Sequence, residues 1–152
     1  MNAYFSTPER IATLVAVAHS WLRTPFVPHA CVKGAGADCI HWVGAALVEC
    51  GHLKSFEFEA YSMDEGKHLK ASKILKWFAG RNDFEAVDGR DLQPGDVFCF
   101  RVGRETHHVG LMLTDGKFMH ALAGREVIES DLRESFYTAN ITAIFRPLEV
   151  QP

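Results

Sequence analysis

The sequence lacks the features that define several large classes of protein. It has no run of roughly 20 apolar residues that could cross a membrane. It has no block of basic residues, and its formal net charge is −3, so nothing in it favours binding to a nucleic acid. No internal repeat or low-complexity tract interrupts the 152 residues, which predicts a single domain spanning residues 1–152.

Cysteine is scarce, and its spacing shows no pairing. The four cysteines form neither a C-x-x-C motif nor a small disulfide-bonded framework. With 47% hydrophobic residues, the chain has enough apolar side chains to fold around a core without a disulfide or a metal ion. Cys50 and Cys99 are expected to be small buried hydrophobes, whereas the pattern assigns no role to Cys31. No cofactor is expected, and the sequence carries no indication of oligomeric state.

The N-terminus lacks the features of a secretory signal peptide. The segment 11–18 is apolar, but Pro8-Glu9-Arg10 precedes it and no small-residue cleavage site follows it. We predict an amphipathic helix here, with the capping box Ser6-Thr7-Pro8-Glu9 at its start. The protein is therefore expected to be cytoplasmic as synthesised.

Helical patterns fill the first half of the chain and strand patterns fill the second. We predict helices within 8–22, 38–50 and 63–78, with an irregular segment at 24–37. Short β-branched or aromatic segments follow, at 97–102, 107–114, 117–121, 127–129 and 141–146. Helices followed by antiparallel strands predict an α+β fold, in which N-terminal helices pack on a central antiparallel β-sheet.

Cys39 is the candidate nucleophile, because it lies where a glycine-containing loop enters a predicted helix. The reactive form of cysteine is the thiolate, and a free cysteine is mostly protonated at neutral pH. Unpaired N–H groups in the first turn of a helix favour the thiolate and can also hold an oxyanion. Asp38 is expected to be the N-cap of this helix. The alternative is a helix that merely begins with a buried cysteine.

A thiol nucleophile needs a base, and the base needs a group that fixes its orientation. Among the eight histidines, His108 and His120 lie on a predicted hairpin. A three-residue turn, Thr114-Asp115-Gly116, would place Gly110 opposite His120 and make the two histidines diagonal neighbours, about 7–8 Å apart at the backbone. A two-residue turn would put them on opposite faces. The alternative is a sheet that carries two partly exposed polar residues.

Four segments occur in an order that resembles a known family. They are Gly36-Ala37-Asp38-Cys39, Leu92-Gln93-Pro94-Gly95-Asp96-Val97-Phe98, His108-Val109-Gly110-Leu111 and Met119-His120-Ala121. This order is similar to that of the NlpC-type cell-wall cysteine peptidases of the papain-like clan, over about residues 8–146. The resemblance implies Cys39 as nucleophile, His108 as base and His120 as orienter. It also implies cleavage of amide bonds in peptidoglycan stem peptides, often between D-glutamate and a diamino acid.

The sequence departs from that family next to the nucleophile. The family usually has Asp-Cys-Ser-Gly, whereas Ile40-His41-Trp42 follows Cys39 here. Phe26 stands where the family usually has a tyrosine, which removes one hydroxyl from the site. The lost contact must then come from elsewhere, from the backbone N–H of Cys39 or from His29 or His41. Phe26, His29 and His41 are the possible substrate or oxyanion contacts near the nucleophile. His41 lies about 200° around the helix from Cys39, which favours a direction away from the substrate.

Three other functions fit the same pattern. The first is an acyltransferase or amidase on another substrate, since an acyl-enzyme can be captured by an amine or an alcohol. The second is a non-catalytic structural or adaptor protein, for example in a phage tail, that retains the fold. The third is a zinc site built from Cys39, His108 and His120, although no helical His-x-x-x-His or C-x-x-C pair supports it and no metal is expected. A phage-associated or otherwise delivered enzyme would also fit the absence of a targeting segment.

Overall fold

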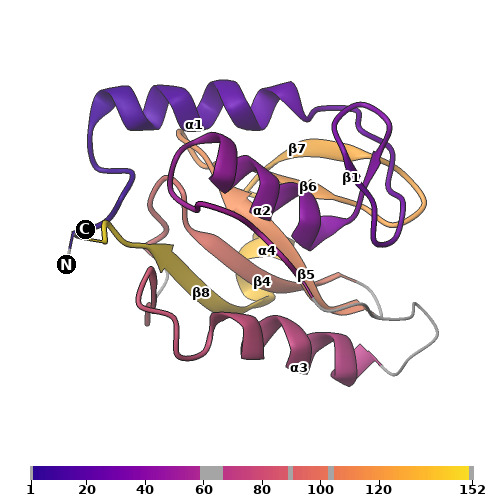
Figure 1. The fold of residues 1–152 in the computed structure, drawn as a ribbon. Helices are drawn as coiled ribbons and strands as arrows, with labels where there is room; N and C mark the ends of the chain where they lie inside the picture. The colour runs from indigo at the N-terminus through magenta and orange to yellow at the C-terminus, as the bar shows by residue number, and fades with distance from the viewer. Residues whose placement is uncertain (1, 59–66, 89–90, 103–104, 151–152) are drawn as a thin grey trace.

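The computed structural model describes residues 2–58, 67–88, 91–102 and 105–150 (Figure 1). The helices are α1 (Pro8–Ser20), α2 (Cys39–Glu49), α3 (Lys67–Phe78) and α4 (Ser135–Ala139). The strands are β1 (Cys31–Val32), β2 (Gly36–Ala37), β3 (Phe84–Ala86), β4 (Val97–Val102), β5 (Glu105–Met112), β6 (Lys117–Ala121), β7 (Val127–Asp131) and β8 (Ile141–Pro147). Helices precede an antiparallel sheet, so the α+β prediction is confirmed.

A six-stranded sheet forms the centre of the molecule, in the order β3-β8-β4-β5-β6-β7 with every neighbouring pair antiparallel. Helices α2 and α3 pack against β5, and α1 packs against α2 (Figure 1). Strands β1 and β2 form a separate two-stranded ladder in the segment that enters α2, and Ala37 of β2 also bridges to Phe26. The sheet therefore supports α2, the helix that begins with Cys39.

Alternating side chains give the sheet two different faces. One face contributes Val97, Cys99, Val109, Leu111 and Met119 to the core beneath the helices. The other face carries an aromatic cluster of Phe98, Phe100 and Phe118 with Met112 and Ile144, and Tyr137 of α4 packs against it. Both faces are buried, because α4 and the segments beside it cover the second one.

The N-cap of α1 is Thr7, one residue later than the Ser6 that the predicted capping box Ser6-Thr7-Pro8-Glu9 would use. The Thr7 hydroxyl accepts the N–H of Arg10, and Pro8 occupies the first turn of α1. The helix ends at Ser20, so the prediction that it continues to Leu22 is wrong by two residues. Pro25 disfavours helix only in the residue before it, which leaves Trp21–Thr24 room for a turn that docks against Val127.

Some short elements were not predicted. The segment 24–37, predicted to be irregular, contains the β1–β2 ladder, and β3 and α4 lie in parts for which no element was predicted. These elements have two to five residues, which is too short for a period of 2 or 3.6 to be visible in the sequence. The predicted third helix is confirmed from Lys67 onward, and its predicted part 63–66 lies outside the described residues.

The two ends of the described chain lie side by side. Tyr4 donates its N–H to Pro147, and Glu149 donates its N–H to Asn2. Within the described residues, no helix has both the length and the apolar character that crossing a membrane would require.

The turn Pro94-Gly95-Asp96 ends in a buried ion pair. Asp96 has no exposed surface, and its two carboxylate oxygens accept Nε and Nη2 of Arg146 in β8, each at 2.9 Å. The same carboxylate accepts the N–H of Gln93 at 2.8 Å. Both oxygens are thus used in a bidentate pair that ties the turn before β4 to the end of β8.

Candidate active site

Asp38 caps α2 and also holds the loop before it. Its Oδ1 accepts the backbone N–H of His41 at 2.9 Å, as predicted for an N-cap. The same oxygen lies 2.8 Å from Nδ1 of His41, and Oδ2 accepts the backbone N–H of His29 at 2.9 Å. The carboxylate is fully buried. One side chain therefore fixes the helix start, the His41 ring and the turn at His29.

Cys39 is the first residue of α2 and has no exposed surface. It belongs to the core beneath the helices and lies close enough to Cys99 to contribute, after burial, to raising the pKa of that thiol to about 12. Cys99 lies in β4, where the next residue, Phe100, pairs with His108. The candidate nucleophile therefore lies near Cys99, one residue before the Phe100–His108 pair in the β4–β5 ladder.

The β5–β6 hairpin has the register that the three-residue turn predicts. The N–H of Leu113 donates to the carbonyl of Lys117 at 2.9 Å, and residues 114–116 form the turn between them. Asp115 and Gly116 both have positive φ, of 57° and 73°. Gly110 pairs with His120. The prediction of a shared face for His108 and His120 is confirmed.

His108, His120 and Ser130 form a chain of hydrogen bonds across three strands. Nε2 of His108 lies 2.9 Å from Nδ1 of His120, and Nε2 of His120 lies 2.8 Å from Oγ of Ser130 in β7. His108 is 2% exposed and His120 is fully buried, so the alternative of two partly exposed histidines is wrong. Ser130 was not predicted, because the expected strand stopped at Glu129.

Aromatic rings surround the histidine pair. The rings of Phe100, Phe118 and Tyr137 lie within 4.8–5.7 Å of the His120 ring, centroid to centroid. Gly110 lies beneath this cluster, and a Cβ atom there would approach Phe98 to 2.9 Å. A side chain at position 110 would therefore displace the rings that pack around the two histidines.

Burial lowers the pKa of His120 from 6.5 to about 4, so its ring is neutral at neutral pH. A neutral imidazole has one N–H donor and one acceptor nitrogen. If Nε2 of His120 donates to Ser130, Nδ1 must accept from Nε2–H of His108. With the hydrogen bond in this direction, His108 can take up a second proton on Nδ1 and become an imidazolium. Only one proton, that of His108 Nε2, then lies between the two rings.

The depressed pKa of His120 predicts a loss of stability in mild acid. In the unfolded chain His120 binds a proton near pH 6.5, whereas in the folded chain it does so only near pH 4. The free energy of unfolding therefore falls as pH falls through this interval. Between about pH 7 and pH 5 the free energy of unfolding should drop by about 1–2 kcal/mol through this group. Urea unfolding at both pH values would measure the drop in wild type and in His120→Gln.

The His120→Gln variant controls for the other buried histidine. Burial also lowers the pKa of His52, which remains in both proteins. The variant should therefore lose less stability on acidification than wild type. An equal loss in the two proteins would show that His120 is protonated freely in the folded state.

The three residues considered for substrate contacts take different positions. Phe26 is partly buried against the core, and its backbone pairs with Ala37 and Arg125. His29 has an exposed side chain and a left-handed backbone with φ of 65°. The His41 ring contacts Asp38 and packs edge-on against Phe56 and Phe58. The structure therefore brings His29 and His41 together at Asp38, and leaves Phe26 in the adjoining loop.

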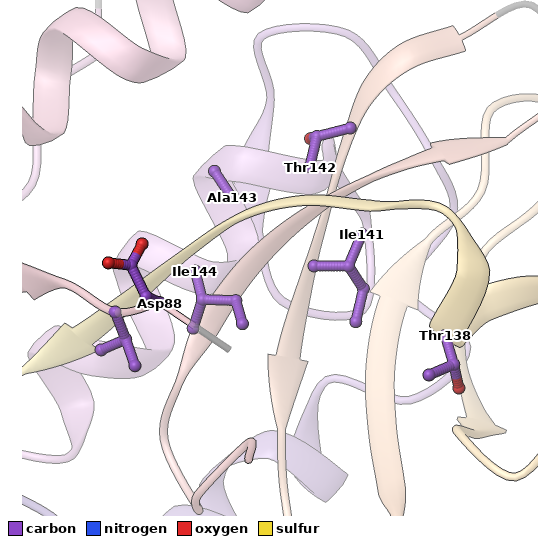
Figure 2. A pocket seen from close by; sticks show the side chains of 7 residues that line it. Asp88, Thr138, Ile141, Thr142, Ala143 and Ile144 are labelled. Carbon is purple, nitrogen blue, oxygen red and sulfur yellow. The ribbon is translucent and has the colours of Figure 1, made fainter. Parts of the chain in front are cut away.

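Pockets among the described residues also lie outside the histidine chain. One, of about 240 Å³, lies over β8 and α4 and contains the hydroxyls of Thr138 and Thr142 (Figure 2). Both hydroxyls donate to backbone carbonyls, those of Leu132 and Cys99. Another, of about 350 Å³, runs along α2 and is lined by Cys31, His41, Ala45, Val48, Glu49, Ser55 and Phe56. Across the described residues, no group of three or more metal-binding side chains gathers.

The structure thus places a cysteine at the start of a helix that packs on an antiparallel sheet. The NlpC/P60 family model matches residues 29–146, and the chain belongs to this family. A Haemophilus influenzae protein named as a probable endopeptidase is 25% identical over 130 residues, which cover 84% of this chain and 69% of that protein.

Solved structures share the fold at low identity. The NlpC/P60 domain of the peptidoglycan hydrolase SagA superposes with a TM-score of 0.58 at 17% identity, covering 88% of this chain and 96% of that domain. A lipoprotein-like member of the family from Staphylococcus aureus gives a TM-score of 0.65 at 15% identity, covering 99% of this chain and 45% of the other. These similarities confirm the predicted NlpC-type α+β fold.

Proposed function

We propose that this protein is a cysteine hydrolase of peptidoglycan stem peptides, with Cys39 as nucleophile, His108 as base and His120 as the group that orients the base. The observation that carries the proposal is the buried hydrogen bond between His108 and His120 at 2.9 Å. A pair of histidines on one face of a sheet is costly to bury unless each ring nitrogen has a partner. The scissile bond we expect is the amide between D-glutamate and a diamino acid.

The burial of the histidine pair supports a role for Nδ1 of His108. Nε2 of this ring faces His120, so proton exchange with a nucleophile would use Nδ1. The β4–β5 ladder shifts register between Phe100 and Val102, directly beside the Phe100–His108 pair. A bulge of this kind turns the side chains next to it, and in this proposal it would help to aim the His108 ring at Cys39.

The chemistry would proceed in two balanced steps. Nδ1 of His108 takes the proton of Cys39, the thiolate adds to the amide carbonyl, and the C–N bond breaks as the imidazolium protonates the leaving amine. A thioester joins Cys39 to the acyl group at this stage. Water then attacks the thioester, His108 takes a proton from that water, and the thiol is released with a carboxylic acid.

The oxyanion of each tetrahedral intermediate would be held by the N-terminal turn of α2. Backbone N–H groups of a first helical turn point at the position where the negative charge develops. Phe26 supplies no hydroxyl to this site, so the backbone N–H of Cys39 becomes the principal donor in the proposal. The fully buried Asp38 supports it by fixing the helix start.

Digestion of defined muropeptides, followed by mass spectrometry, tests this function. We expect fragments that carry a new amine on the diamino acid and a new carboxylate on D-glutamate. Products of another mass, in which an added amine or alcohol has captured the acyl group, would instead identify an acyltransferase. Intact muropeptides after prolonged incubation would contradict the proposal and favour a non-catalytic adaptor.

The ionisation of the four thiols gives an independent prediction. Burial is the largest cause that raises the pKa of Cys50 and of Cys99 to about 12, and it also raises the pKa of Cys31. A thiolate present at about pH 6 should therefore come from Cys39 alone. The ultraviolet absorbance of the thiolate, compared between wild type and Cys39→Ala, would measure it without requiring access to the buried sulfur. Identical absorbance in the two proteins would remove the activated nucleophile from the proposal.

A further inference from the structure

Ser130 is a polar contact of the histidine pair that the three proposed catalytic residues leave unexplained. Its Oγ lies 2.8 Å from Nε2 of His120, on the side of the ring opposite His108. Ser130 lies in β7, where it pairs with Phe118, and its side chain is partly buried. It therefore reaches the pair from a third strand, beyond the β5–β6 hairpin.

The surroundings of His120 leave the ring few ways to satisfy its two nitrogens. Phe100, Phe118 and Tyr137 contact the ring through their aromatic faces or edges. In the part of the chain that the structure describes, the hydrogen-bonding partners of the ring are His108 and Ser130. Removing the serine hydroxyl would leave Nε2 buried among aromatic rings, and such an orphaned polar atom is unfavourable.

The direction of the hydrogen bonds decides what His108 can do. When Nε2–H of His120 donates to Ser130, Nδ1 of His120 is an acceptor and can receive Nε2–H of an imidazolium at His108. In the opposite tautomer, Nδ1–H of His120 points at His108. A neutral His108 must then carry its proton on Nδ1, which is the nitrogen that has to accept the proton of Cys39.

We propose that Ser130 is a positioning residue that selects the Nε2–H tautomer of His120, and so keeps Nδ1 of His108 available as the base. This inference rests on the proposed function for its catalytic consequence. Ser130 itself touches neither substrate nor Cys39 in this scheme. Its effect is transmitted through one ring to the next, along the two hydrogen bonds at 2.8 Å and 2.9 Å.

Nitrogen NMR of histidine-labelled protein tests the tautomer directly. In wild type, Nε2 of His120 should show the resonance of a protonated ring nitrogen and Nδ1 that of an unprotonated one. Ser130→Ala should give a mixture of the two tautomers, and Ser130→Thr, which keeps the hydroxyl and suits a strand, should restore the wild-type pattern. A wild-type pattern in Ser130→Ala would overturn the inference.

Kinetics of muropeptide cleavage test the consequence. Ser130→Ala should lower kcat about tenfold, as expected when one buried hydrogen bond is lost, with KM nearly unchanged. Ser130→Thr should recover most of this loss. The matched control is Glu129→Ala, the neighbouring residue of β7, which pairs with His19 at the surface and should leave kcat at the wild-type value.

The two readouts separate this inference from the proposed function. If wild type cleaves no muropeptide but the NMR pattern of His120 depends on the Ser130 hydroxyl, the proposed function fails and the tautomer selection stands. If wild type cleaves and Ser130→Ala cleaves equally well, the proposed function stands and the role of Ser130 is refuted.

Discussion

Replacement of Cys39 by alanine is expected to abolish muropeptide cleavage, with a fall in kcat/KM of at least about 10³-fold. The reason is that no other described thiol can take its place. Cys50 and Cys99 are held as neutral thiols by burial, and Cys31 lies outside the helix start, with its sulfur directed at the carbonyl of His41. Initial rates measured on a defined muropeptide would quantify the loss.

Two controls make the result on Cys39 specific. Cys31→Ser alters an exposed cysteine in β1 and should leave the rate within about twofold of wild type, as a surface substitution does. Circular dichroism and thermal unfolding of Cys39→Ala should show a folded protein, because a small side chain replaces a small buried one. A folded Cys39→Ala protein that cleaves at the wild-type rate would be incompatible with a thioester intermediate.

The second large effect concerns stability and not catalysis. Arg146→Met should lower the free energy of unfolding by about 3–5 kcal/mol, because it leaves the carboxylate of Asp96 buried without its counter-charge. Asp96 is fully buried and Arg146 is 14% exposed at its side chain. Chemical denaturation at neutral pH, with the slope of the transition compared between variants, would measure the difference.

The matched control is Arg133→Met. Arg133 also donates two hydrogen bonds, from Nε and Nη2, to the carboxylate of Asp131, but the Arg133 side chain is 74% exposed. An exposed pair of this kind contributes about 0–1 kcal/mol. We therefore expect Arg146→Met to be several times more destabilising than Arg133→Met. Similar losses in the two variants would mean that water reaches Asp96 in the folded protein.

Much of the site follows from local sequence signals. The hairpin register could be predicted because Asp115 and Gly116 favour the left-handed backbone, and because alternation then carries His108 and His120 to one face. The N-cap role of Asp38 could be predicted from residue type and position alone. In both cases the determining interactions join residues that are close in the sequence.

Ser130 could not be found in this way, because the contact depends on strand pairing across a longer connection. The segment after Val127 contains Glu129, Ser130 and Asp131, residue types that disfavour strands. Pairing with β6 nevertheless extends β7 to Asp131 and carries Ser130 to the histidines. The full burial of Asp38 was also beyond prediction, since it results from the loop at His29 folding over the helix start.

The buried carboxylate of Asp38 has a consequence for how a thiolate could exist beside it. Asp38 already accepts N–H groups of the first turn of α2 and of the preceding loop, so it occupies part of the positive end of that helix. A thiolate at Cys39 would be a second anion at the same helix start, one residue away. Because the Asp38 carboxylate already uses the positive end of α2, the helix dipole can stabilise a thiolate at Cys39 only weakly. If Cys39 is the nucleophile, its charge must be balanced across the sheet by the imidazolium of His108, and ionisation of the thiol becomes inseparable from the state of the histidine chain.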